Sequence, residues 1–164
     1  MTTTSGNMGK LLVNGSGKGN KAIYGWIFFY IASAVLCFVA AQTLGYTRIW
    51  GFWGTVPVRN PFWYIFIVLG IINLIFIPIV AVAISKTYIK VCELGVMGRG
   101  ISKWFYMGDV RSFDFMLTYD QVSVDVNGGQ IVVHGLGTNY KVYVENGPKI
   151  QQTVVALQQV RQRK

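Results

Sequence analysis

The side chains that could do chemistry are few and far apart in the sequence. The only histidine is His134, and the two cysteines are Cys37 and Cys92. Neither cysteine has a second cysteine or a histidine at metal-ligand spacing, so we expect two free thiols that act as small apolar residues. The local sequence around His134 offers no serine–histidine–aspartate order, carboxylate pair or metal-ligand set. The sequence therefore predicts a protein that is not an enzyme and uses no cofactor or metal.

The composition indicates a membrane protein. Of the 164 residues, 52% are hydrophobic, and the mean hydropathy of +0.43 is too apolar for an ordinary soluble domain of this length. Two uncharged runs, residues 22–44 and 62–85, each exceed the roughly 20 residues that cross the hydrocarbon core of a bilayer. Aromatic residues crowd the ends of both runs, where amphipathic rings favour the headgroup level. We expect a two-helix transmembrane hairpin over residues 22–85.

The first run has an alternative interpretation as a cleaved signal peptide. Lysines precede it, and the small residues of "FVAAQ" near its end resemble a cleavage site. Its apolar length exceeds the roughly 7–15 residues of a signal core, which favours a retained helix. Whether the first helix is processed stays open on the sequence alone.

The distribution of lysine and arginine predicts the orientation of the two helices. The connection over residues 45–61 carries only Arg48 and Arg59. The segments on the other side of the helices carry seven cations close to the membrane: Lys10, Lys18, Lys21, Lys86, Lys90, Arg99 and Lys103. By the positive-inside rule, we expect a multi-pass protein of the cell membrane with both termini cytoplasmic.

The net charge of +9 raises the question of nucleic acid. No basic run with interleaved aromatic residues lies outside the apolar half, so we expect no nucleic-acid partner. Residues 1–21 are rich in Thr, Gly, Asn and Ser and are predicted to be a flexible cytoplasmic tail. Their "LLVNGSGKGN" lacks the first glycine and the hydroxyl residue of a phosphate-binding loop, so no nucleotide or other small-molecule substrate is evident.

From residue 86 onwards the pattern changes to that of a small antiparallel sheet. Apolar residues alternate in short runs separated by turn signals such as "NGG". The predicted strands are residues 87–93, 96–101, 111–117, 121–127, 130–136 and 140–145. The last segment changes period, because Ile150, Val154 and Leu157 recur at helical spacing. We expect a C-terminal amphipathic helix that covers the open end of the sheet.

The stretches "YIKVCELGVMGRG", "MGDVRSFDF", "NGGQIVVHG" and "YVENGPKI" resemble the bacterial pleckstrin-homology-like (PH-like) domains that follow a pair of transmembrane helices. The resemblance covers residues 86–162. It implies a membrane α + β protein in which a small PH-like barrel or sheet, residues 86–164, ends in one helix. This half is short for such a domain, so a strand is expected to be missing or the barrel incomplete.

The resemblance implies a binding or scaffolding module. Some relatives bind phosphoinositides through basic residues of the first hairpin, which makes Lys86, Lys90, Arg99 and Lys103 the candidate contacts for anionic lipid. Generic attraction of such cations to headgroups is the simpler explanation. A groove between an open sheet edge and the last helix is a second candidate site, for a peptide strand.

The leading functional hypothesis is therefore a membrane-anchored scaffold or adaptor. It would bind a protein partner, or form a homo-oligomer that organises an assembly, at the cytoplasmic membrane face. One alternative is a small accessory subunit of a larger transporter or channel complex. Another is a module that binds anionic membrane lipids.

Overall fold

The computed structural model describes residues 8–102, 111–135 and 137–163. The predicted lipid contact Lys103 lies outside the described residues. The chain forms two compact units: one combines Met1–Ile23 with Val82–Lys164, and the other is Tyr24–Ala81. The first unit therefore contains residues from both ends of the chain, whereas the sequence predicted a separate module that begins at residue 86.

Two long helices dominate the middle of the chain, α1 (Ala22–Leu44) and α2 (Pro61–Ser85). Their bounds agree with the predicted apolar runs, and both are long and apolar enough to cross a membrane. They pack closely, because a side chain at Gly70 would come within 2.7 Å of the Phe38 ring. The Tyr30 and Phe76 rings stack with centroids 5.9 Å apart. Most of the remaining side chains of α1 and α2 are exposed, as expected of helices that lipid would cover.

The connection between the two helices is a β-hairpin that the sequence analysis did not predict. Strands β2 (Tyr46–Gly51) and β3 (Gly54–Arg59) pair antiparallel over their whole length. Gly54 has a φ of 110°, which a residue with a side chain rarely adopts, so it allows the tight turn. Asn60 closes the base of the hairpin, since its Nδ2 donates to the Leu44 carbonyl at 2.9 Å.

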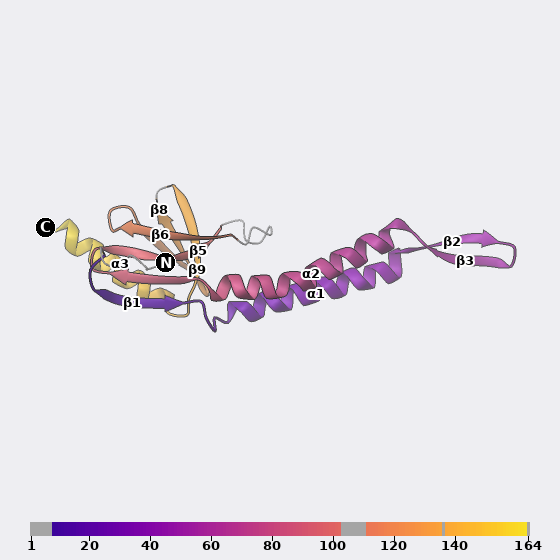
Figure 1. Cartoon of the computed structure of the whole chain (residues 1–164), viewed down its shortest axis with the longest axis horizontal. Coiled ribbons are helices and arrows are strands. Elements are labelled where there is room, and N and C mark those ends of the chain that lie inside the picture. Colours follow the sequence, from indigo (N-terminus) through magenta and orange to yellow (C-terminus); the bar gives the residue numbers. More distant parts are fainter. Residues whose placement is uncertain (1–7, 103–110, 136, 164) are drawn as a thin grey trace, which may run out of the picture. The chain divides into compact units, whose positions relative to one another are not determined.

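The other unit is a seven-stranded curled sheet with a terminal helix (Figure 1). All of its strand pairs are antiparallel, as predicted. Its elements are β1 (Leu11–Ser16), β4 (Tyr88–Cys92), β5 (Gly95–Ile101), β6 (Ser112–Thr118), β7 (Ser123–Asn127), β8 (Gln130–Gly135), β9 (Thr138–Tyr143) and α3 (Gly147–Gln162). The strands form two meanders, β1-β4-β5-β6 and β7-β8-β9, which join where Ile101 of β5 pairs with Lys141 of β9.

The prediction of a flexible tail over residues 1–21 is wrong for the segment that forms β1 (Leu11–Ser16). This strand pairs with β4, from Leu11 opposite Cys92 to Ser16 opposite Tyr88. Its inner side packs on the core at Val13. At Gly15 a side chain would come within 2.7 Å of Ile150, so the absence of a side chain lets the strand approach α3. Tertiary pairing thus orders a stretch whose composition indicated disorder.

One hydrophobic core holds the sheet unit together. Its buried side chains come from both meanders and from α3: Ile89, Val91, Val96, Phe115, Leu117, Tyr119, Val122, Val124, Ile131, Val133, Val142, Val144, Ile150 and Val154. The predicted stripe of α3 faces this core, with Ile150 and Val154 buried and Leu157 partly buried. The prediction of a small antiparallel sheet with a C-terminal amphipathic helix is confirmed, and the PH-like identity of this unit stays a prediction.

Candidate functional site

The two ends of the apolar segment leave the sheet at neighbouring points. We call residues 17–22 and 84–87 the junction. The Gly17 N–H donates to the Thr87 carbonyl at 2.8 Å, which extends the contact between the two chain segments beyond the last pair of β1 and β4. A side chain at Gly17 would overlap the Ile84 carbonyl oxygen and the Thr87 hydroxyl. Only glycine fits this crossing without a shift of the backbone.

Thr87 fixes the second segment of the junction. Its side chain is buried, with 1% exposed. The Oγ1 hydroxyl donates to the Ile84 carbonyl at 2.8 Å, and it accepts a hydrogen bond from the Tyr143 N–H at 3.3 Å. A buried hydroxyl with both functions satisfied stabilises the end of α2 against β9.

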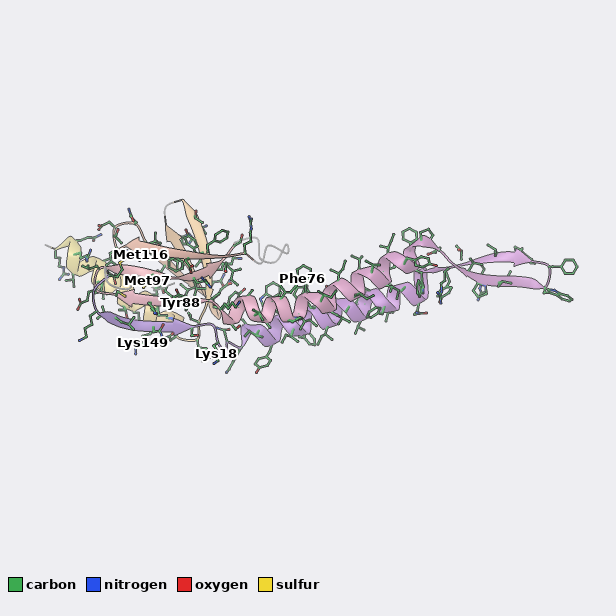
Figure 2. The ribbon with its side chains drawn as sticks, in the orientation of Figure 1. Lys18, Phe76, Tyr88, Met97, Met116 and Lys149 are labelled. Carbon is green, nitrogen blue, oxygen red and sulfur yellow. The ribbon has the colours of Figure 1, made fainter. Side chains whose placement is uncertain are left out.

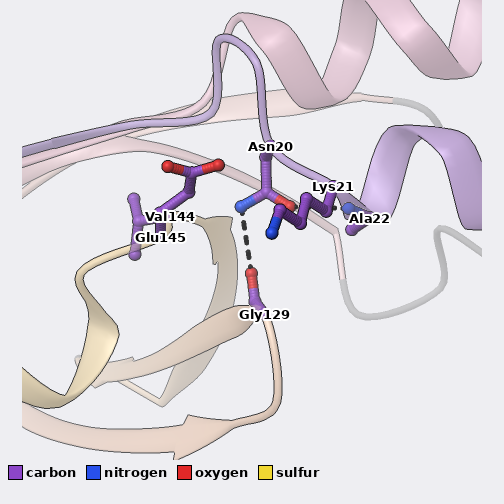
Figure 3. A pocket seen from close by; sticks show the side chains of 6 residues that line it. All are labelled: Asn20, Lys21, Ala22, Gly129, Val144 and Glu145. Carbon is purple, nitrogen blue, oxygen red and sulfur yellow. Dashed lines mark hydrogen bonds between the residues drawn. The ribbon is translucent and has the colours of Figure 1, made fainter.

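Asn20 fixes the first segment and lines a pocket (Figure 3). It is buried, with 2% exposed, and both ends of its amide are used. Its Oδ1 accepts a hydrogen bond from the Ala22 N–H at 2.8 Å and so caps the start of α1. Its Nδ2 donates to the Gly129 carbonyl at 3.2 Å, in the turn between β7 and β8.

The pocket beside Asn20 has a volume of about 450 Å³. It is lined by Asn20, Lys21, Ala22, Gly129, Val144 and Glu145. Lys21 and Glu145 contribute one positive and one negative side chain, both exposed. Such a pocket can hold a small polar group. The sequence analysis missed it, although an asparagine two residues before an apolar run is a recognisable helix-capping signal.

Three of the four predicted lipid contacts, Lys86, Lys90 and Arg99, lie within the described residues. Arg99 is engaged by Asp114, with Nε to Oδ1 at 2.7 Å and Nη2 to Oδ2 at 2.8 Å. The hydrogen bonds from Arg99 lower the pKa of the Asp114 carboxyl, and those same bonds raise the pKa of Arg99. Asp114 thus offsets the positive charge of Arg99, which was predicted to contact anionic headgroups. Lys86 is exposed directly after α2, and Lys90 lies half-buried on β4 with its Nζ 5.7 Å from the Tyr88 ring centroid, so a lipid role for these two residues stays a prediction.

His134 lies on the outward face of the second meander. Its Nε2 is 2.9 Å from Asp125 Oδ2, and its Nδ1 is 2.8 Å from Asn139 Oδ1. Both ring nitrogens therefore lie within hydrogen-bonding distance of a side-chain oxygen. In the described parts of the chain, no three His, Cys, Asp or Glu side chains gather to hold a metal ion.

The sheet has edges of two kinds. Side chains of α3 occupy the edge of β7, because Gln151 donates to the Val124 carbonyl at 2.9 Å and Gln158 donates to the Val122 carbonyl at 2.7 Å. The predicted peptide groove between this edge and α3 is therefore closed, which corrects that expectation. The edge of β1 is also contacted, since Asn146 Nδ2 donates to the Asn14 carbonyl at 3.1 Å.

The edge of β6 differs from the other two. β6 pairs with β5 on one side, and among the described residues no strand pairs with its other side. It exposes Phe113 by 41% and Met116 by 47%. Met116 lies on the outer face, opposite Met97 of β5, and Met97 lies opposite Lys90 of β4. Tyr88, which Figure 2 labels with the two methionines, lies opposite Arg99. This open edge is the candidate surface for a protein partner.

Comparison of the chain with models of protein families, with curated proteins and with solved structures finds no match.

Proposed function

We propose that this protein is a two-pass membrane scaffold whose sheet unit lies at the cytoplasmic face and binds a protein partner. The observation that most supports the proposal is that the apolar segment lies between two paired strands of the sheet. It leaves the sheet after β1 and returns at β4, and these two strands are hydrogen-bonded neighbours. Paired strands must lie on the same side of a membrane, so the segment between them crosses an even number of times. Two apolar helices meet that requirement.

The same arrangement supports retention of the first helix. Cleavage after α1 would remove β1 from the sheet and expose the edge of β4, together with the core side chains beneath Val13. The excess of lysine and arginine on the sheet side of the helices supports the cytoplasmic location.

The assignment of the sheet unit to the PH-like superfold is part of this proposal. The antiparallel strands in two meanders, followed by one helix, support this assignment. The strand that seemed to be missing from residues 86–164 is supplied by β1, from before the first helix. The apolar helices would then be an insertion between the first two strands of the domain.

The open edge of β6 supports strand addition as the mode of partner binding. The other two edges have hydrogen-bonding side chains on their carbonyl groups, and unmanaged edges invite pairing with another chain. A partner strand here would also cover Phe113 and Met116. Anionic-lipid binding has weaker support, because Asp114 engages Arg99.

The proposal can be tested by gentle detergent extraction followed by native mass measurement. We expect a complex with a bound protein that is lost in Met116→Lys and kept in Val160→Lys, a matched change on an exposed residue of α3 (57% exposed). A chain that extracts without any bound protein would defeat the scaffold. A stoichiometric complex with a large polytopic subunit, insensitive to Met116→Lys, would favour the accessory-subunit alternative.

A further inference from the structure

The pocket beside Asn20 carries two opposite charges that are not paired with each other. Lys21 and Glu145 both line it, and both are exposed. Over residues 8–102, 111–135 and 137–163, neither side chain has a partner in an ion pair or a hydrogen bond. Figure 3 shows the two side chains on either side of Asn20. A ligand with one negative and one positive group can therefore engage both side chains at once.

The wall between these two charges is fixed by buried groups. Asn20 is held by the Ala22 N–H at one end of its amide and by the Gly129 carbonyl at the other. Val144, which is 1% exposed, belongs to the core of the sheet unit. The volume of about 450 Å³ falls in the range of about 300–1,000 Å³ that small-molecule sites have. A pocket whose wall is already ordered needs little reorganisation when a ligand enters.

The position of Lys21 indicates the negative group of the ligand. Lys21 is the last residue before α1, which begins at Ala22. Under the proposed anchor, this end of the helix lies at the headgroup level of the bilayer, where long lysine side chains reach the polar layer. The anions of that layer are the lipid phosphates, and a lysine ammonium binds phosphate as a point charge.

Glu145 and Gly129 indicate the positive group. A primary ammonium has three N–H donors, and a carboxylate and a backbone carbonyl are the acceptors that such donors need. The Gly129 carbonyl accepts one hydrogen bond from Asn20, which leaves its second lone pair for a ligand. A trimethylammonium group has no N–H to donate and is recognised by aromatic faces instead. None of the described residues that line the pocket is aromatic, so its chemistry favours ethanolamine over choline.

We infer that this pocket binds the headgroup of phosphatidylethanolamine, with Lys21 on the phosphate and Glu145 on the ammonium. The inference rests on the proposed two-pass anchor, which brings Lys21 to the level of the phosphates. The site is separate from Lys86, Lys90 and Arg99, the contacts predicted for anionic lipid. A purely anionic headgroup such as phosphatidylglycerol would engage Lys21 but place its charge near the Glu145 carboxylate without an ammonium to offset it.

Native mass measurement of the full-length chain in mild detergent tests the inference. Three lipids with the same acyl chains are added separately, with ethanolamine, choline or glycerol headgroups. We expect about fivefold more bound ethanolamine lipid than either of the others. Glu145→Gln should reduce the ethanolamine lipid to the level of the choline lipid and leave the choline lipid unchanged. Lys21→Gln should reduce both, because both carry the phosphate.

Matched variants on exposed residues outside the pocket serve as controls. Asp120→Asn removes another carboxylate, and Lys149→Gln removes another lysine, and both should keep the lipid preference of the parent. Equal binding of the three lipids by the parent chain would overturn the inference, as would an unchanged preference in Glu145→Gln. Glycerophosphoethanolamine, the headgroup without acyl chains, should not displace the lipid at equal concentration. Displacement would assign the pocket to a soluble zwitterion and overturn the assignment to lipid.

The proposed anchor is read separately with a membrane-impermeant maleimide. In a Cys37→Ala, Cys92→Ala background, Thr55→Cys places one thiol on β3 and Lys149→Cys places one on α3. Labelling from opposite sides of sealed vesicles supports the anchor, and labelling from the same side contradicts it. Opposite labelling without a headgroup preference would refute only the lipid site and leave the anchor in place.

Discussion

The two units of this chain bury their apolar residues in opposite ways. In the sheet unit, side chains from the strands and α3 meet in one core, and the buried polar side chains Asn20 and Thr87 are hydrogen-bonded. In the unit of α1, α2 and the β2–β3 hairpin, most large apolar side chains are exposed. The first unit buries its apolar side chains by its own packing, and the second leaves most of them exposed, as expected of helices that lipid would cover. A large apolar side chain should therefore contribute more to the free energy of unfolding in the sheet unit than in the unit of α1 and α2.

The largest expected difference between the two units is the loss in free energy of unfolding when a leucine is truncated to alanine. Leu117→Ala removes a side chain that is 1% exposed in the sheet core and should lower the free energy of unfolding by about 2–5 kcal/mol. Leu74→Ala in α2, where the side chain is 44% exposed, should change it by less than about 1 kcal/mol. Thermal unfolding in mild detergent, followed by the circular dichroism of the sheet, measures both. Equal losses would contradict the contrast between the two units.

A smaller effect is expected where the chain passes from one unit into the other. Asn20→Ala removes both the cap of α1 and the tether to Gly129, at a cost of about 1–2 kcal/mol. Asn20→Asp keeps the acceptor for the Ala22 N–H and loses the donor to Gly129. Its cost should therefore be intermediate, as read by hydrogen exchange of the first turn of α1. If the alanine variant were as stable as the parent, Asn20 would not organise the junction.

The smallest effect concerns the exposed ion pair of Arg99 and Asp114. Because Arg99 lowers the pKa of Asp114 in the folded state, the pair stabilises the fold above the unfolded pKa of about 3.9 and loses that contribution as the pH falls through the folded pKa. Both side chains are well exposed, so the contribution is about 0.2–1 kcal/mol at low salt. Asp114→Asn should therefore be less stable than the parent at pH 7, and the difference should shrink as the pH falls through the folded pKa of Asp114. Asp120→Asn, a change of another exposed carboxylate, is the control, and a pH-independent difference for Asp114→Asn would contradict the assignment.

Local patterns in the sequence were sufficient for most elements of the sheet unit. Alternation over short runs located the strands from β4 to β9, and the spacing of Ile150, Val154 and Leu157 located α3. The apolar runs located α1 and α2 because length and absence of charge are also local properties.

What the sequence did not reveal depends on contacts between distant residues. Strand β1 was missed because its glycine- and asparagine-rich segment becomes ordered only by pairing with β4, which follows it after both helices. The pairing of Arg99 with Asp114 follows from the register of β5 and β6, which the sequence pattern does not fix. The β2–β3 hairpin was not predicted, because aromatic residues beside an apolar run also fit a membrane interface without any strand pairing.

The most direct measurement compares two soluble versions of the sheet unit. One joins residues 8–21 to residues 86–164 through a short glycine–serine linker in place of the apolar helices, and the other is residues 86–164 alone. Ser16 lies opposite Tyr88, so a short linker spans the gap. If the helices are an insertion between paired strands, the linked version unfolds cooperatively in urea, and the version without β1 is less stable by at least about 2 kcal/mol or does not fold. Equal stability of the two versions would contradict the account.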